Sequence, residues 1–361
     1  MKLYRKLAAI VMAAFIALLA CSCDSSGSSK LGINNAHGVT VNDLAGVTEE
    51  TIKLLKENGI TFVRIPFMYP YQADGVSLTP AYIRSKKAAE MFNEAGITVM
   101  GQTFWPGGMG YNAAKGGVVW NSNIPEVYTD FDDPYFYTIS KNAVKYMSED
   151  LKNLVDIWLI SNEPDIRTYT GAMTPQQICD FLIECAEGVK QGNPDAKCGI
   201  NFLGKVNTSY SLSFVEALYG EGSFFDWIGL DGYYGTLQEG GPETWDDYIN
   251  EFHNAAPDFP VIITEWSYSS ATKDPKKTCK YAWNGHERGP ETQADYVKAC
   301  MEIFSKHPEV KGTLWYALCD QSGVCWECGD PECNLYSSWG LIDTENKAKP
   351  SVKAFGEVLV K

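Results

Sequence analysis

Short apolar runs alternate with amphipathic stretches along the chain from Leu31 onward. The apolar runs have the length of buried strands, and the stretches between them are long enough for helices. Repeated units of one strand followed by one helix indicate a parallel sheet with helices packed on its outside. Eight strands are predicted, over residues 31–35, 62–67, 98–103, 157–161, 197–202, 227–230, 261–264 and 312–317.

Start and stop signals support the helices between these strands. Thr174 and Pro175 precede an apolar periodic segment that ends at Gly192, in the order of an N-cap, a first helical residue and a terminating glycine. This order predicts a helix over residues 175–192. Further helices are expected over residues 80–95 and 291–307 and from Pro350 onward.

Eight such units predict a single (β/α)8 TIM barrel with extended loops after the third and eighth strands. A doubly wound open sheet is the alternative, but it would be unusually long, and no Gly-x-Gly-x-x-Gly motif follows the first strand. The chain shows neither a repeat of fixed period nor an internal linker. We therefore expect one (β/α)8 domain over residues 31–361.

The N-terminus has the pattern of an export signal. Three basic residues within the first six positions precede an uninterrupted apolar run over residues 8–20, which is too short to span a membrane. We expect residues 1–20 to be a signal peptide. The small residue before Cys21 resembles a bacterial lipobox, which implies lipidation of Cys21, with residues 21–30 as a flexible tether. Ordinary secretion with cleavage elsewhere is the alternative. The expected location is the bacterial cell surface or a periplasm-facing membrane.

The charge of the chain narrows the class of partner. The formal net charge is −15 and the isoelectric point is about 4.8, which argues against nucleic acid because that partner requires a basic face. An acidic protein suits a neutral partner such as a carbohydrate. The 10 tryptophans and 20 tyrosines agree with this, since flat rings stack on sugar faces, although most of them are expected in the core. We expect a monomer.

Four of the 11 cysteines lie close together: Cys319, Cys325, Cys328 and Cys333. In an exported protein two disulfides that staple this loop are favoured over a zinc site, but the spacing allows both. Five others are scattered over predicted helices and strands, where a thiol can act as a small buried apolar group. We predict no metal at the active site.

Two glutamates directly follow predicted strands. Glu163 follows the fourth strand and Glu265 the seventh, and the loops after the strands build the active face of such barrels. A carboxylate next to a buried strand is costly unless it is used. Two that face each other across one barrel mouth predict glycoside hydrolysis. One would donate a proton to the leaving oxygen and the other would attack the anomeric carbon, at the separation of about 5–5.5 Å that gives retention.

The chain resembles the clan A retaining glycoside hydrolases, which are (β/α)8 enzymes with Asn-Glu-Pro on strand four and a glutamate nucleophile on strand seven. The resemblance covers the mature domain and looks closest to families 39 and 5. Its motifs are VRIP (63–66), ISNEPD (160–165), DWIGLDGYY (226–234), ITEW (263–266), TLWY (313–316) and WGLID (339–343).

The resemblance implies a role for each residue that matches a motif. Glu163 would be the general acid/base and Glu265 the nucleophile. Asn162 would bond the 2-hydroxyl of the sugar, a contact that tightens in the transition state. Arg64 would bond the nucleophile and keep it ionised. No cofactor is implied, because both catalytic groups are side chains.

Other implied contacts lie around the sugar. Tyr233, or alternatively Tyr234, would donate its hydroxyl to Glu265, and Trp315 would form the floor of the sugar site. The histidines that several clan members carry at strands three and six are missing here. His37 after the first strand is a substitute for the first of them, or a structural histidine.

The long loops are expected to shape the substrate cleft. We expect Trp105, Trp266 and Trp326 to line it as stacking platforms. The predicted function is a retaining, endo-acting β-glycanase on a polysaccharide such as β-glucan, xylan or mannan. An exo-acting β-glycosidase or β-xylosidase and a non-catalytic sugar-binding lipoprotein are the alternatives.

Overall fold

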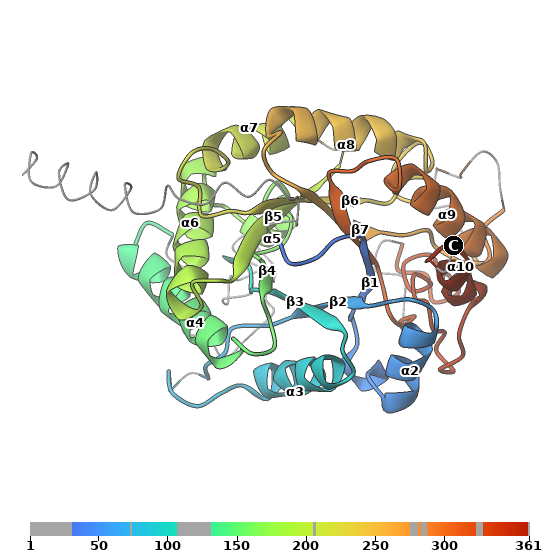
Figure 1. The fold of residues 1–361 in the computed structure, drawn as a ribbon, viewed down its shortest axis with the longest axis horizontal. Coiled ribbons are helices and arrows are strands. Elements are labelled where there is room, and N and C mark those ends of the chain that lie inside the picture. Colours follow the sequence, from blue (N-terminus) through green and yellow to red (C-terminus); the bar gives the residue numbers. More distant parts are fainter. Residues whose placement is uncertain are drawn as a thin grey trace, which may run out of the picture.

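Eight parallel strands close into a barrel in which each strand is hydrogen-bonded to the next and β8 to β1 (Figure 1). The computed structural model describes residues 31–72, 74–106, 131–204, 207–274, 281, 283, 287–322 and 328–359. The predicted (β/α)8 TIM barrel is therefore confirmed. Its strands are β1 (Ala36–Thr40), β2 (Phe62–Pro66), β3 (Thr98–Gln102), β4 (Ile157–Leu159), β5 (Lys197–Leu203), β6 (Trp227–Gly232), β7 (Val261–Trp266) and β8 (Val310–Trp315).

The long helices surround the barrel as a ring (Figure 1). The capping signals act as the sequence predicts: Thr174 and Gln177 form a reciprocal capping box, and Pro175 is the first residue of α6. Pro80 and Pro350 likewise open helices. The helical elements are η1 (Leu44–Gly46), α2 (Glu49–Glu57), α3 (Pro80–Glu94), α4 (Pro134–Asp150), α5 (Arg167–Thr170), α6 (Pro175–Gly192), α7 (Thr208–Leu218), α8 (Thr244–Ala255), α9 (Pro290–Phe304) and α10 (Pro350–Leu359).

The first strand lies later in the chain than predicted. Residues 31–35 do not pair with a strand; Leu31 and Ile33 are buried against apolar side chains inside the barrel, and the segment crosses the barrel opening in Figure 1. β1 instead begins at Ala36 and pairs with both β2 and β8. Its sequence AHGVT is weakly apolar because Gly38 must be small: a Cβ there would lie 2.0 Å from the Phe62 carbonyl oxygen. Residues 31–35 are thus an apolar plug that fills the interior of the barrel, and the predicted first strand is wrong because its apolar pattern belongs to this plug.

Side chains of the strands alternate between two cores. Inward-facing residues such as Phe62, Ile157 and Trp227 form a cluster inside the barrel. Outward-facing residues such as Val63 and Ile228 belong to the larger core between strands and helices. Since a shift of one residue moves a side chain from one core to the other, this alternation decides which strand residues can reach the active face.

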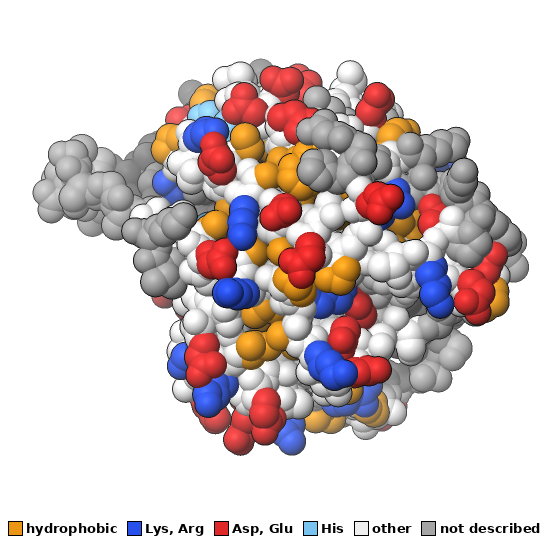
Figure 2. Space-filling model, turned by 90° about the vertical axis from the view of Figure 1, so that its right-hand side faces the viewer, with side chains coloured by type: hydrophobic (Ala, Val, Ile, Leu, Met, Phe, Trp, Pro, Cys, Tyr) orange, Lys and Arg blue, Asp and Glu red, His pale blue; other side chains and the backbone are white. Residues whose placement is uncertain are grey.

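The outer surface carries both signs of charge. Figure 2 shows acidic and basic side chains interspersed on the side of the molecule that carries α10. On this side Lys298 of α9 and Glu357 of α10 form an ion pair of 2.8 Å between the two helices. Within the described ranges, none of the helices combines the length and the apolar character needed to cross a bilayer.

Candidate active site

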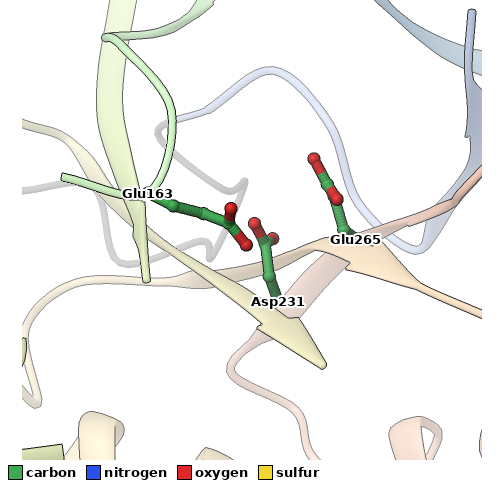
Figure 3. A group of neighbouring side chains, drawn as sticks. All are labelled: Glu163, Asp231 and Glu265. Carbon is green, nitrogen blue, oxygen red and sulfur yellow. The ribbon is translucent and has the colours of Figure 1, made fainter. Parts of the chain in front are cut away.

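Glu163 and Glu265 meet in one cavity of about 440 Å³ at the C-terminal ends of the strands. Both carboxyl groups are buried, and a third, that of Asp231, lies between them (Figure 3). One oxygen from each of the three lies within 4.8 Å of the others. The remaining lining comes from the loops after β4, β5, β6 and β8: Ile166, Thr168, Tyr169, Leu203, Tyr233, Leu237, Gln238, Tyr316, Gln321, Tyr336 and Trp339.

The backbone that presents Glu163 is strained. Ser161 and Glu163 have φ values of 68° and 37°, in the left-handed region that costs a non-glycine residue about 1–3 kcal/mol. Two side chains from neighbouring strands hold this turn. The Ser161 N–H donates to the Thr103 hydroxyl at 2.8 Å, and the Glu163 N–H donates to Asn201 Oδ1 at 2.9 Å. The turn directs the Glu163 carboxyl group toward Asp231 (Figure 3).

Glu265 is held by a donor at each of its oxygens. Nη2 of Arg64 on β2 donates to Oε1, and the Tyr233 hydroxyl donates to Oε2. Burial alone would lower the pKa of Arg64, but Glu265 and Asp231 outweigh it, so that the pKa is raised and the guanidinium stays charged. A carboxylate oriented by a guanidinium and a phenol is suited to nucleophilic attack.

The surroundings of Glu163 favour its protonated form. Burial raises its pKa well above the usual value, and the negative charges of Glu265 and Asp231 raise it further. Nδ2 of Asn162 donates to Glu163 Oε2 at 3.3 Å. The site therefore holds one carboxyl group that retains a proton beside one that carries a charge balanced by Arg64, which is the pairing that acid-assisted glycoside cleavage requires.

Asp231 was not among the predicted site residues. It directly follows the apolar run 227–230, so the rule that singled out Glu163 and Glu265 would have found it. An irregularity in the β6–β7 register places Asp231 opposite Glu265. Thr264 Oγ1 donates to Asp231 Oδ1 at 2.6 Å, and Asn201 Nδ2 donates to the other oxygen.

Aromatic side chains from the loops form the walls of the cavity. Tyr233 and Trp339 pack edge to face with ring centroids 5.3 Å apart, and Tyr336 packs on Trp339. Tyr316, the residue after β8, lines the cavity directly, and Tyr169 of α5 closes it on the β4 side. Of these residues, Tyr233 alone is predicted from the sequence to have a site role: Tyr316 falls in the predicted strand 312–317, and Tyr169, Tyr336 and Trp339 follow the strands in segments without a periodic pattern.

Trp315 and Trp266 lie outside the cavity, contrary to prediction. Both are fully buried in the outer core, 4.9 Å apart edge to face, and both pack against Phe355 of α10. Trp315 also donates its indole N–H to the Trp339 carbonyl. The alternation along β8 turns Trp315 outward, so that the next residue, Tyr316, lines the cavity.

His37 is likewise not at the active face. It is the second residue of β1, in the half of the strand far from the catalytic end, and its Nδ1 lies 3.1 Å from the Thr313 hydroxyl. Burial lowers its pKa to about 4. It borders a separate cavity beside Lys298 and Glu357. The prediction that it contacts sugar is wrong, because it depended on the misplaced first strand.

The remaining predicted residues are near the site or outside the described ranges. Trp105 is half-buried and packs edge to face on Tyr169, a residue of the cavity wall, with ring centroids 5.5 Å apart. Cys21, Cys325 and Trp326 fall outside the described residues. Lipidation and the pairing of the cysteine-rich loop thus stay predictions.

Glu163, Asp231 and Glu265 are also the group that, in the described part of the chain, could hold a metal ion. The ion pair of Arg64 with Glu265 argues against a cation there, because the guanidinium already supplies a positive charge beside this carboxylate. The donor set suits proton transfer and nucleophilic attack.

The comparisons with known structures agree with this fold. GH5_18 from Streptomyces cattleya in complex with GlcNAc has a TM-score of 0.66 at 16% identity, over 91% of this chain and 80% of that one. An exo-β-1,4-mannosidase from Opitutaceae bacterium strain TAV5 has a TM-score of 0.65 at 17% identity, over 94% and 62%. Xylanase 10B from Thermotoga petrophila RKU-1 in complex with xylobiose has 0.62 at 16%, over 93% and 98%. At these identities the likeness shows the fold alone.

The comparison of sequences shows the family. No curated protein matches the chain. The family described as glycosyl hydrolase catalytic core matches residues 130–340, a span that includes Glu163, Asp231 and Glu265. Because this match covers more than half of the chain, the protein belongs to the glycosyl hydrolase catalytic core family and is a glycosidase of the (β/α)8 type.

Proposed function

We propose that the chain is a retaining β-glycosidase that cleaves β-linked polysaccharide internally, with Glu265 as nucleophile and Glu163 as general acid/base. The observation that carries the proposal is the short separation of these two buried carboxyl groups in one cavity, with oxygens within 4.8 Å. Inverting enzymes keep the pair about 6.5–9.5 Å apart to admit a water between them.

The two groups divide the reaction between them. Glu265 attacks the anomeric carbon while Glu163 protonates the departing oxygen, which gives a covalent glycosyl–enzyme. Glu163, now ionised, then takes a proton from the water that releases the sugar. In this proposal Asn162, next to the acid, bonds the sugar 2-hydroxyl. Arg64 and Tyr233 orient the nucleophile through their contacts with both of its oxygens.

The lining of the cavity supports internal cleavage. It includes residues that follow β4, β5, β6 and β8, among them the aromatic side chains of Tyr169 and Trp339. Such a cleft can bind sugar units on either side of the cleaved bond. The similar structures include both an exo-acting mannosidase and a xylanase, so product analysis must decide the mode.

The test is a panel of aryl β-glycosides and β-linked polysaccharides, hydrolysed by the wild type and by Glu265→Gln. We expect hydrolysis by the wild type and its loss in the variant, while Glu50→Gln, at an exposed site on α2, serves as the matched control. Short oligosaccharides as early products would support endo action, and monosaccharide alone would support exo action. Equal activity of the wild type and Glu265→Gln would refute the assignment.

Azide rescue separates the two roles. With an activated aryl β-glycoside, Glu265→Gly and azide should give the α-glycosyl azide, because azide attacks in place of the nucleophile. Glu163→Gly and azide should give the β-glycosyl azide from the glycosyl–enzyme. If Glu265→Gly gave the β-glycosyl azide and Glu163→Gly the α-glycosyl azide, Glu163 would be the nucleophile and Glu265 the acid/base.

We further propose that the enzyme acts at the cell surface on a lipid anchor at Cys21. Support comes from the basic and apolar segments that precede this cysteine. Mass spectrometry of the N-terminal peptide should find diacylglycerol on Cys21, and Cys21→Ala should move the protein out of the membrane fraction. A Cys21→Ala protein that stays membrane-bound would contradict the anchor.

A further inference from the structure

Asp231 has no role in the two-glutamate reaction, although it occupies the centre of the site. Its side chain is fully buried and lies between Glu163 and Glu265 (Figure 3). A buried carboxyl group that performs no step is costly unless its neighbours use it. The contacts of Asp231 therefore indicate what it does for Glu163 and Glu265.

The donors around Asp231 support its ionised form. The Thr264 hydroxyl donates to one oxygen at 2.6 Å and Asn201 Nδ2 donates to the other. Asn201 also accepts the Glu163 N–H, so Asp231 and the acid are tied to the same amide side chain. In addition, oxygens of the Glu163 and Asp231 carboxyl groups lie within 4.8 Å of each other, and hydrogen bonding with Asp231 is one of the causes that raise the pKa of Glu163.

The charges in the described part of the site favour a bound proton. There the three carboxyl groups of Glu163, Asp231 and Glu265 lie with one guanidinium, that of Arg64, so full ionisation would leave two uncompensated charges in a buried space. Burial, and after it the charge of Glu265, raises the pKa of both Glu163 and Asp231. Among the described residues, the other titratable groups that act on this pair are Asp165, Tyr169, Tyr233, Tyr248 and Tyr316, none of which supplies a positive charge.

We propose that Asp231 is a positioning residue that shares one proton with Glu163 and so keeps the general acid protonated until a glycan enters the cavity. This inference rests on the proposed function. In the resting site the proton lies between the two carboxyl groups. During glycosylation it passes from Glu163 to the departing oxygen, which takes the electron pair of the broken bond, and Glu265 forms the new bond to carbon. The water that releases the sugar returns the proton to the pair.

The first test is Asp231→Asn, which keeps the shape and removes the charge. Glu163 then ionises beside a neutral amide, so the basic limb of the kcat/KM profile should move to lower pH by about one to three units. Near neutral pH, kcat/KM should fall for a glycoside with a poor leaving group. It should change little for a 2,4-dinitrophenyl glycoside, whose departure needs no proton.

Two further variants separate this role from a structural one. Thr264→Val removes the hydroxyl donor from Asp231, which raises the proton affinity of the pair, so its basic limb should move to higher pH. Asp226→Asn removes a carboxylate near the opposite end of β6, where it pairs with Lys190, and should leave the limb in place. Coincident basic limbs in Asp231→Asn and the wild type, equal losses on both leaving groups, or a downward shift in Thr264→Val would overturn the proposal.

A titration without substrate keeps the inference separate from the proposed function. Carboxyl ¹³C NMR, assigned by difference from Glu163→Gln, should show a group in the wild type that titrates well above the ordinary range, and at lower pH in Asp231→Asn. If this holds but the wild type hydrolyses no glycan of the panel, the proposed function fails and the shared proton stands. If Glu163 titrates alike in both proteins, the shared proton is refuted whatever the activity.

Discussion

Asp165 gives a prediction about stability whose size follows from its surroundings. It lies two residues beyond Glu163, accepts from the Ser211 hydroxyl at 2.7 Å and from the Leu203 N–H, and is mostly shielded from water. Burial raises its pKa from 3.8 to about 6, although both hydrogen bonds act to lower it. The folded state therefore binds this proton more tightly than the unfolded chain does.

The sign of the effect follows from that difference. The stabilisation by the bound proton is fully present below about pH 4 and is lost as the pH rises through about 6. A shift of about two units corresponds to about 3 kcal/mol. Asp165→Asn keeps an oxygen acceptor for Ser211 and Leu203 but does not titrate. Relative to this variant, the wild type should lose about 2–3 kcal/mol of unfolding free energy between about pH 4 and pH 7.5.

Urea unfolding of the two proteins at a series of pH values measures this difference, since other titrating groups cancel between them. Asp258→Asn, at an exposed position before β7, provides the baseline for removing an aspartate. A difference between the wild type and Asp165→Asn that stays constant with pH would refute the reasoning, because it would mean that burial does not hold a proton on Asp165.

Four other variants test where these residues lie relative to the site. Tyr233→Phe removes a donor to Glu265, and since a hydrogen bond to a charged group is worth about 1.5–3 kcal/mol, kcat/KM should fall about tenfold to a hundredfold, without loss of thermal stability. Trp315→Ala should lower the unfolding free energy by about 3–5 kcal/mol, because it empties a space in the outer core, whereas Tyr169→Ala should chiefly raise KM. His37→Gln should leave kcat and KM unchanged, as it lies at the other end of the barrel; altered KM would contradict that placement.

The barrel and the pair of glutamates were predictable because both follow from local signals. A buried parallel strand must be apolar over several residues, so seven of the eight runs lie where the strands are found, with ends that differ by one or two residues in most cases. The active face then follows from strand ends alone, which brings Glu163 and Glu265 together although about a hundred residues separate them.

The failures have physical causes that a linear pattern does not contain. Residues 31–35 are apolar because they plug the barrel, and hydrophobicity does not distinguish a plug from a strand. Trp315 and Tyr316 are neighbours of similar character, and the phase of the alternation along β8, which places Leu314 inside the barrel and Trp315 in the outer core, decides that Tyr316 faces the cavity. Asp231 reaches the site through a register irregularity between β6 and β7, which depends on pairing rather than on either strand by itself.

The same geometry explains why the barrel can hold three carboxyl groups in so small a space. Each belongs to a different strand or strand end, and donors reach this group of carboxyl groups from several strands: Arg64 from β2, Asn201 from β5 and Thr264 from β7. A buried ionic group is tolerated when its hydrogen bonds are made and its charge is balanced, and one guanidinium balances one carboxylate here. One bound proton removes half of the imbalance that remains, leaving one uncompensated negative charge instead of two. A site built to retain a proton at rest is already prepared to give it to a glycosidic oxygen.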